Sequence, residues 1–290
     1  MLREQSRTVD FLILGAGWTS QFLIPALTAS HITYAATTTT GRDSTLPFKF
    51  DPDSTATEPY TQLPSAHTIL IVFPLVGPSQ SKTLVHLYRS IHGAHNHWIQ
   101  LGATTIYNQL PTAWSDDASP YNTADPRAIA EDKLRALGGE VLNLSGLYGG
   151  TRDPRTWLPR IVRCKQDVRA RGAVHFIHGA DVARAVLATH RNPQPGKRWI
   201  VSDLRVYDWF DLIMSFSAAA AAPAAAMGGD EAARSDDAAL CGQCAQWVGE
   251  IMLEDGIRAL PRSVEVLGRK LDSRGFWEAH GVWPGHGRVA

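Results

Sequence analysis

The stretch that decides the fold is "FLILGAGWTSQF", which runs from Phe11 to Phe22. Its apolar first half ends at a glycine and predicts a short buried strand, and Trp18 to Leu27 then has the pattern of a helix. The turn between them reads G-x-G-x-x-S, where a dinucleotide-binding turn reads G-x-G-x-x-G. The sequence therefore raises the question of whether this turn holds a nicotinamide cofactor.

Each position of the turn has its own task. Gly15 allows the tight turn, Gly17 lets the backbone approach a diphosphate, and the third position lets helix and strand pack closely. Ser20 changes only the packing position, and serine is small. The helix still points its amides at the phosphates. We therefore expect Gly15, Gly17, Trp18, Thr19 and Ser20 to bind a cofactor. The alternative is a tight turn without a ligand.

Strand-like and helical segments alternate through the first half of the chain. Strands are expected at Val9–Leu14, His31–Thr37, Thr68–Pro74, His97–Thr105 and Glu140–Gly146, with a helix at Ala124–Leu137. This alternation predicts right-handed crossovers and a parallel sheet. We expect an α/β fold: a Rossmann-type doubly wound parallel sheet with a smaller C-terminal α/β substrate lobe.

The second half has a mixed pattern. Helices are expected at Thr156–Arg163, Ala180–His190, Val206–Phe216 and Arg262–Gly281, and strands at Ala173–Gly179 and Lys197–Asp203. Between them, residues 217–238 begin with an alanine-rich run interrupted by Pro223. We interpret this segment as a low-complexity surface insertion, mobile or loosely helical.

The composition limits the function classes. The 290 residues include 28 basic and 28 acidic side chains, so no basic excess indicates nucleic acid. No apolar run approaches the roughly 20 residues of a membrane span, and the first residues lack a secretory signal. Three cysteines are too few for a disulfide framework. We expect a cytoplasmic protein with a small-molecule substrate, no nucleic-acid or membrane partner, and oligomerisation as an open possibility.

Seven segments resemble, in order, the extended short-chain dehydrogenase/reductases, a family that includes NAD(P)-dependent epimerases and dehydratases. They are LILGAGWTSQFLIPAL, TTTTGRD, GATTIY, RAIAEDKL, LSGLYGG, FIHGADVARAVLA and RWIVSDLRVYDWFDLI, within roughly residues 9–216. The nearest likeness is to atypical members. The resemblance implies a Rossmann domain over residues 1–150 and a substrate lobe over 151–290, with about 173–203 returning to the Rossmann domain.

The end of the second strand bears on the choice of cofactor. An acidic residue there favours NAD, because it binds the ribose 2′-hydroxyl. This chain has Thr39, Thr40 and Arg42 instead, and Arg42 can pair with a 2′-phosphate. We therefore expect Thr40 and Arg42 to bind NADP, with NAD possible. The alternatives are a solvated arginine, or an alignment displaced so that Asp43 takes the acidic position.

The family's active members use Ser/Thr, Tyr and Lys. Thr104 or Thr105 matches the Ser/Thr position, but Thr123 falls at the tyrosine and Arg127 at the lysine. Threonine cannot act as a base near neutral pH, whereas arginine can hold a ribose or phosphate. We expect Arg127 to bind the cofactor.

Four further side chains are candidates for the site. Tyr107 resembles the family's tyrosine beside the substrate, and Tyr121 lies two residues before Thr123. Either could supply the missing phenol, although Tyr107 could equally be an aromatic residue packed at a strand end. Leu147 and Tyr148 follow the fifth strand, where ligands gather in such sheets. We expect them to line the nicotinamide pocket.

Two other patterns are weaker. His92, His95 and His97 stand close together without a matching cysteine or carboxylate, so we expect a solvated loop and no metal site. Cys241 and Cys244 have redox spacing but follow no thioredoxin-like strand, and we interpret them as ordinary helix cysteines.

The sequence thus predicts an NADP-binding reductase or epimerase that acts on a small organic substrate. Two alternatives remain open because the Tyr/Lys pair is missing. One is a nucleotide-binding sensor or scaffold without turnover. The other is a non-redox isomerase or lyase that uses the same cleft.

Overall fold

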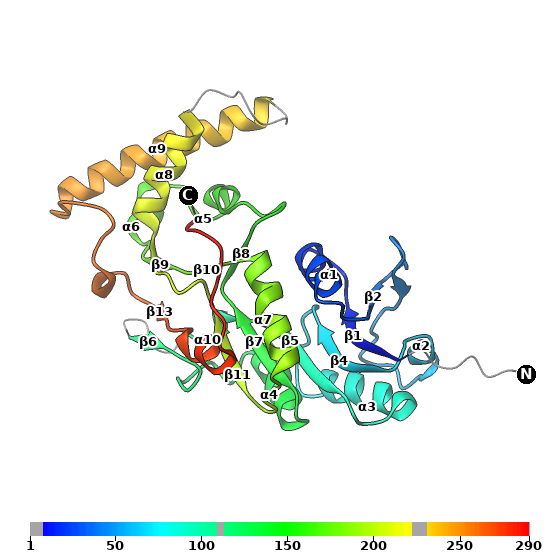
Figure 1. Cartoon of the computed structure of the whole chain (residues 1–290). Coiled ribbons are helices and arrows are strands. Elements are labelled where there is room, and N and C mark those ends of the chain that lie inside the picture. The colour runs from blue at the N-terminus through cyan, green and yellow to red at the C-terminus, as the bar shows by residue number, and fades with distance from the viewer. Residues whose placement is uncertain (1–7, 109–112, 222–230, 290) are drawn as a thin grey trace, which may run out of the picture.

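The core of the protein is a seven-stranded parallel sheet (Figure 1). The computed structural model describes residues 8–108, 113–221 and 231–289. The strands are β1 (Val9–Leu14), β2 (Tyr34–Thr38), β3 (Leu46–Pro47), β4 (Ala66–Ile71), β5 (His97–Ala103), β7 (Glu140–Leu144) and β11 (Arg198–Val201). Their order is β11-β7-β5-β4-β1-β2-β3, so the chain reverses its direction of travel between β1 and β4. The carboxyl ends at such a reversal are where ligands bind in doubly wound sheets.

Helices cover both faces of the sheet. One face carries α1 (Ser20–Ala29), α7 (Gly179–Arg191) and α10 (Arg274–His280), and the other carries α2 (Glu58–Thr61), α3 (Gln80–His92) and α4 (Pro126–Ala136). Along β1, Phe11 and Ile13 pack on the first face, and Leu12 and Leu14 pack on the second. Burial on both faces explains the apolar strands. The expected fold class is confirmed.

A smaller lobe follows the sheet. Its paired strands are β8 (Gly146–Tyr148) with β10 (Phe176–His178), and β9 (Ala173–Val174) with β12 (Tyr207–Asp208). Its helices are α5 (Leu158–Ile161), α6 (Lys165–Arg169), α8 (Trp209–Ala221) and α9 (Glu231–Glu254). Helices α8 and α9 form a hairpin far from the sheet (Figure 1). A third pair joins β6 (Trp114–Ser115) to β13 (Lys270–Leu271), and 3₁₀ turns lie at η1 (Thr104–Ile106), η2 (Pro154–Trp157) and η3 (Val264–Val266).

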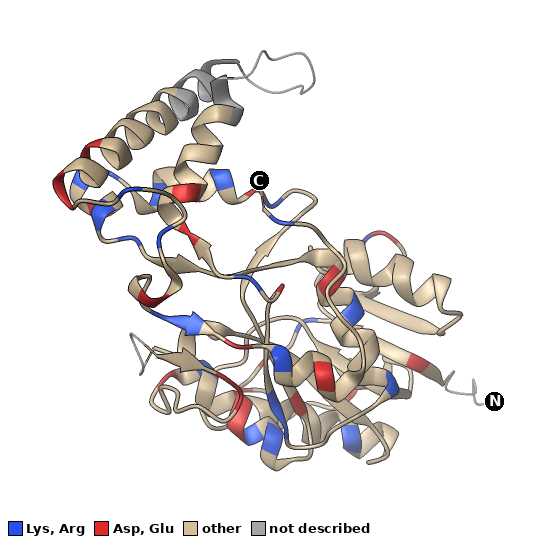
Figure 2. Ribbon diagram, turned by 60° about the vertical axis from the view of Figure 1, so that its left-hand side comes forward, with Lys and Arg blue, Asp and Glu red and all other residues tan. Residues whose placement is uncertain are grey.

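The distribution of charged residues and the character of the helices agree with the balanced composition of the sequence. Acidic and basic positions are intermixed along the ribbon (Figure 2). Within the described ranges, no helix combines the length and apolar character that crossing a bilayer requires.

Four segments of the second half differ from the expectation. The helix expected at Val206–Phe216 starts only at Trp209, because Tyr207 and Asp208 form β12. The strand expected at Ala173–Gly179 is broken at His175, which separates β9 from β10. The single helix expected at Arg262–Gly281 was wrong: this range holds η3, β13 and only seven residues of α10. Gly268 has a φ of +81°, which a continuous helix cannot accommodate. The expected helix at Thr156–Arg163 is shorter and divided between η2 and α5.

The alanine-rich segment is partly outside the described structure. Residues 217–221 end α8 and residues 231–238 lie in α9, whereas 222–230 fall outside the described residues. Cys241 and Cys244 are buried on α9.

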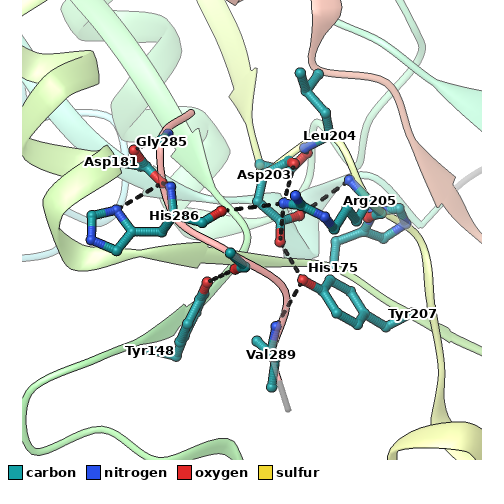
Figure 3. Close-up of polar contacts among 12 residues, drawn as sticks. Tyr148, His175, Asp181, Asp203, Leu204, Arg205, Tyr207, Gly285, His286 and Val289 are labelled. Carbon is teal, nitrogen blue, oxygen red and sulfur yellow. Dashed lines mark hydrogen bonds and ion pairs between the residues drawn. The ribbon is translucent and has the colours of Figure 1, made fainter. Parts of the chain in front are cut away.

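The C-terminal tail, residues 282–289, binds back onto the lobe (Figure 3). The amides of Gly285 and His286 donate to the two carboxylate oxygens of Asp181, over 2.7 and 3.0 Å. The Tyr148 hydroxyl donates to Gly287 O over 2.9 Å, and Val289 N donates to the Tyr207 hydroxyl over 3.1 Å. The tail therefore connects α7 to β8 and β12.

Candidate functional site

The glycine turn after β1 is held by the end of β2. Gly15 N donates to Thr37 Oγ1 over 3.0 Å, and Ala16 N donates to Thr37 O over 2.6 Å. Gly15 has a φ of +95°, and a side chain there would also approach Phe73, to 3.2 Å. Glycine is thus required by the turn itself.

Gly17 has a different reason to be glycine. A Cβ at this position would meet no atom within 4 Å, so it would project into open space. Among the described residues, neither the Trp18 nor the Thr19 amide donates a backbone hydrogen bond. These amides precede α1, where the helix dipole favours an anion. Ser20 is only 6% exposed and occupies the packing position.

The turn opens into a cavity of about 360 Å³ at the carboxyl ends of β4, β5 and β7. Its lining consists of Gly17, Trp18, Thr19, Val72, Pro74, Leu75, Gln100, Leu101, Gly102, Ala103, Arg127, Glu131, Leu144, Ser145, Leu147 and Arg152. A larger hollow of about 930 Å³ lies at the amino ends of β1 and β2. Ligands of such sheets bind at the carboxyl ends, so the smaller cavity is the candidate site.

Buried polar groups line this cavity. Gln100 Oε1 and Ser145 Oγ have no hydrogen-bond partner within the described part of the chain, although these residues are only 1% and 5% exposed. Buried polar atoms normally have a hydrogen-bond partner, so two such atoms without one in the same cavity point to a ligand or water there.

Glu131 is the acidic member of the lining. Its Oε2 accepts from Asn143 Nδ2 over 3.0 Å and pairs with Arg198. Burial raises the pKa of this carboxyl, and Arg198 opposes the shift. The arrangement keeps a buried acid beside the cavity, balanced by a buried guanidinium.

Sequence reasoning missed Gln100, Glu131, Ser145 and Arg152. Two of them carried a signal that could have been used: Gln100 is a polar residue within an apolar strand, and Glu131 is four residues after Arg127, on the same face of α4. Ser145 and Arg152 carried none beyond their position after the fifth strand.

Arg127 is the second residue of α4 and lies at the cavity wall. Asp125 caps the helix by accepting from Arg127 N over 2.8 Å, and Pro126 occupies the first turn. This local start places the Arg127 side chain in the cavity lining. Thr123 is exposed in the preceding loop and does not line the cavity.

None of the candidate proton donors, Thr104, Thr105, Tyr107 and Tyr121, belongs to the lining of this cavity in the described structure. Thr104 and Thr105 belong to η1, and Tyr107 follows its last residue. Tyr107 is fully buried, and among the described residues its hydroxyl has no hydrogen-bond partner. Burial raises the pKa of Tyr107 well above its usual 10. The pKa of Tyr121 is raised as well, first by burial and then by its hydrogen bond to Asp132. Tyr107 and Tyr121 are therefore both neutral near pH 7.

Leu147 and Tyr148, both in β8, point in opposite directions. Leu147 lines the cavity, whereas Tyr148 points to the other face of β8 and donates to the C-terminal tail. Successive side chains of a strand alternate in this way.

The turn after β2 lies away from this cavity. Thr38 Oγ1 accepts from Gly41 N over 3.0 Å and from Arg42 N over 3.2 Å, which shapes the turn. Thr40 and Arg42 are exposed, and the Arg42 guanidinium lies 3.9 Å from Asp43.

The histidines of "HGAHNHW" do not converge. His92 contacts Tyr60 O over 2.8 Å, and His97 lies 3.3 Å from Glu140. Across the described ranges, no three histidine, cysteine or acidic side chains gather as metal ligands.

Comparison of the structure with solved structures identifies the fold. It is similar to dTDP-glucose 4,6-dehydratase from Bacillus anthracis in complex with NAD, with a TM-score of 0.63, 12% identity, and 96% and 92% of the two chains covered. It is also similar to RMD from Pseudomonas aeruginosa complexed with NADPH, with a TM-score of 0.56, 13% identity, and 96% of this chain and 95% of that chain covered. A nucleoside-diphosphate-sugar epimerase from Staphylococcus aureus is similar with a TM-score of 0.55, 16% identity, and 96% of this chain and 97% of that chain covered.

The chain has the epimerase/dehydratase fold. This confirms, at the level of fold, the resemblance to extended short-chain dehydrogenase/reductases. No protein-family model matches the sequence, and the search of curated proteins finds no similar sequence. At these low identities, the cofactor and the reaction have to be argued from the site itself.

Proposed function

We propose that this protein binds NADP(H) in the cavity at the carboxyl edge of the sheet and is a reductase or epimerase of a small organic substrate. The observation that carries the proposal is the glycine turn. Gly17 leaves open space, and the Trp18 and Thr19 amides, which donate to no described backbone group, stand at a cavity whose lining includes polar side chains. A helix start with free amides suits a diphosphate.

Different residues of this chain would bind different parts of the cofactor. The turn from Gly15 to Ser20 would hold the diphosphate, and Arg127 would hold the nicotinamide ribose. Leu147 would lie against the nicotinamide, and Thr40 and Arg42 would meet the 2′-phosphate. When bound, the nicotinamide supplies or accepts a hydride.

Proton transfer is assigned to Tyr107 or Tyr121, with Thr104 or Thr105 as a hydrogen-bonding partner of the substrate. Since both phenols are neutral near pH 7, either would act as a proton donor and not as a phenolate base. A sensor or scaffold without turnover is the second candidate. It is favoured by the absence of both phenols from the cavity lining. A non-redox isomerase or lyase would use the same cavity.

Titration of the protein with NADPH tests the proposal. Gly17→Val would put a branched side chain into the open space and should weaken NADPH binding at least tenfold, because the diphosphate could no longer approach the backbone. Gly249→Val on α9 is the matched control, since a Cβ there also meets no atom within 4 Å. Equal affinity of Gly17→Val and the unmodified protein would show that the turn is not a cofactor site.

A further inference from the structure

Arg152 is held at the cavity by a tight loop. The loop from Gly149 to Arg152 follows β8 and closes on itself, because Gly149 N donates to Arg152 O over 2.9 Å and Arg152 N donates to Gly149 O over 3.1 Å. Gly149 has a φ of +101°, and a Cβ there would lie 2.3 Å from His178 Nε2. The path of the loop is therefore closely constrained.

Trp18 positions the loop and the guanidinium together. Its indole Nε1 donates to Gly149 O over 3.0 Å, which ties the glycine turn of β1 to the loop after β8. The Arg152 guanidinium carbon lies 4.4 Å from the centre of the Trp18 ring. A planar cation over an indole face is attracted to it, so Trp18 acts as a platform for Arg152.

The charge of Arg152 is not neutralised by an acid. In the described parts of the chain, no carboxylate pairs with Arg152 within 4.0 Å, whereas Arg155 in the same segment is paired with Asp153. Arg152 lines the same cavity as Gly17 and Thr19, whose surroundings favour an anion. The unpaired Gln100 Oε1 and Ser145 Oγ of that cavity independently point to a ligand.

We infer that Arg152 binds the diphosphate of the bound dinucleotide, carried by the loop that leads into the lobe and presented by Trp18. This inference rests on the proposed function. Arg152 adds a fork of donors that matches a phosphate, which backbone amides alone do not supply. Cofactor binding thereby engages the loop from the second lobe as well as the Rossmann domain.

Calorimetric titration with three probes tests the inference. ADP-ribose carries the diphosphate, 2′-AMP carries only the 2′-phosphate, and NADPH carries both. Arg152→Ala should weaken ADP-ribose and NADPH about tenfold to hundredfold and leave 2′-AMP unchanged. Arg42→Ala should weaken the binding of 2′-AMP and leave the binding of ADP-ribose unchanged. The loss in Arg152→Ala should shrink as salt is raised.

Two further variants separate charge from position. Arg152→Lys should recover only part of the affinity, because a lysine keeps the charge without the planar fork. Arg160→Ala removes another exposed arginine, outside the cavity, and should bind every probe normally. Unchanged affinity of Arg152→Ala for ADP-ribose and NADPH overturns the role of Arg152 alone. Failure of the unmodified protein to bind NADPH or ADP-ribose overturns the proposed function and this inference together.

Discussion

Single charged side chains determine what this cavity can bind. Arg198 is buried and paired with Glu131 and Asp132, so these two carboxylates neutralise its charge within the fold. Arg127 and Arg152 line the cavity without such a pairing in the described structure. A cavity with two such arginines and one internally balanced acid favours an anionic ligand.

Arg42 is predicted to set the preference for NADPH over NADH. It is exposed, and its pairing with Asp43 at 3.9 Å is too loose to compete with a phosphate. A charge-assisted contact to the 2′-phosphate is worth about tenfold to hundredfold in affinity. Arg42→Ala should therefore erase most of the NADPH preference measured by calorimetry. If the unmodified protein binds both cofactors equally, this role of Arg42 is wrong.

Tyr107→Phe is predicted to separate stability from catalysis. No described group pairs with the buried Tyr107 hydroxyl, so its removal should leave the free energy of unfolding unchanged within about 1 kcal/mol or raise it. A lost proton donor should lower kcat about 10²–10⁴-fold. Tyr121→Phe is the comparison, because it loses a hydrogen bond to Asp132 and should lose about 1 kcal/mol.

Normal turnover by both phenylalanine variants would rule out the two phenols as donors. The sensor and non-redox readings would then come before the reductase.

At the scale of elements, His175 decides where one strand ends and another begins. Its Nδ1 contacts Arg205 O over 2.9 Å, and its Nε2 accepts from Leu271 N over 3.1 Å. These contacts require a neutral imidazole with the proton on Nδ1. They join the junction of β9 and β10 to β13, which explains why an apparently continuous strand is divided.

The His175 junction predicts a loss of stability in acid. Burial lowers the pKa of His175 to about 4, below its usual 6.5. The unfolded chain therefore binds a proton that the folded chain refuses. The stabilisation is present above pH 6.5 and is lost as the pH falls toward 4, to a total of about 3 kcal/mol.

Denaturant unfolding at several values between pH 7.5 and 4.5 measures this effect. His175→Gln should be less stable at pH 7.5 but should show a shallower decline toward acid. An identical decline in both proteins would contradict the assignment to His175.

At the scale of the whole molecule, the C-terminal tail joins parts that are distant in sequence. Asp181 at the start of α7 accepts both tail amides, and Tyr148 and Tyr207 contact the tail from the lobe (Figure 3). The hydrogen bond from Tyr148 to Gly287 O ties the tail to β8, the strand that also carries Leu147 of the candidate site.

Asp181→Asn is predicted to loosen the tail. Asparagine keeps one acceptor oxygen, so one of the two buried amide contacts is lost, at about 1–3 kcal/mol of unfolding free energy. Urea unfolding measures the loss, and digestion by a carboxypeptidase should become faster. Asp43→Asn, at an exposed carboxylate, should change neither. An equally stable and equally resistant Asp181→Asn would show that these contacts do not hold the tail.

The sequence by itself determined the parallel sheet, its apolar strands and the turn at Gly15 and Gly17. These features depend on patterns within a few neighbouring residues, where strand burial and backbone conformation act directly. It also placed Arg127 and Leu147, because each stands at a fixed distance from the start or end of a regular element.

Only the tertiary structure decided which polar side chains meet. Trp18 reaches the Gly149 carbonyl across 131 positions of sequence, and Glu131 reaches Arg198 across 67. The outward direction of Tyr148, the division at His175 and the binding of the tail to Asp181 likewise depend on partners far along the chain. Such contacts follow from packing, since nothing in the local sequence records which distant group will satisfy a buried hydrogen bond.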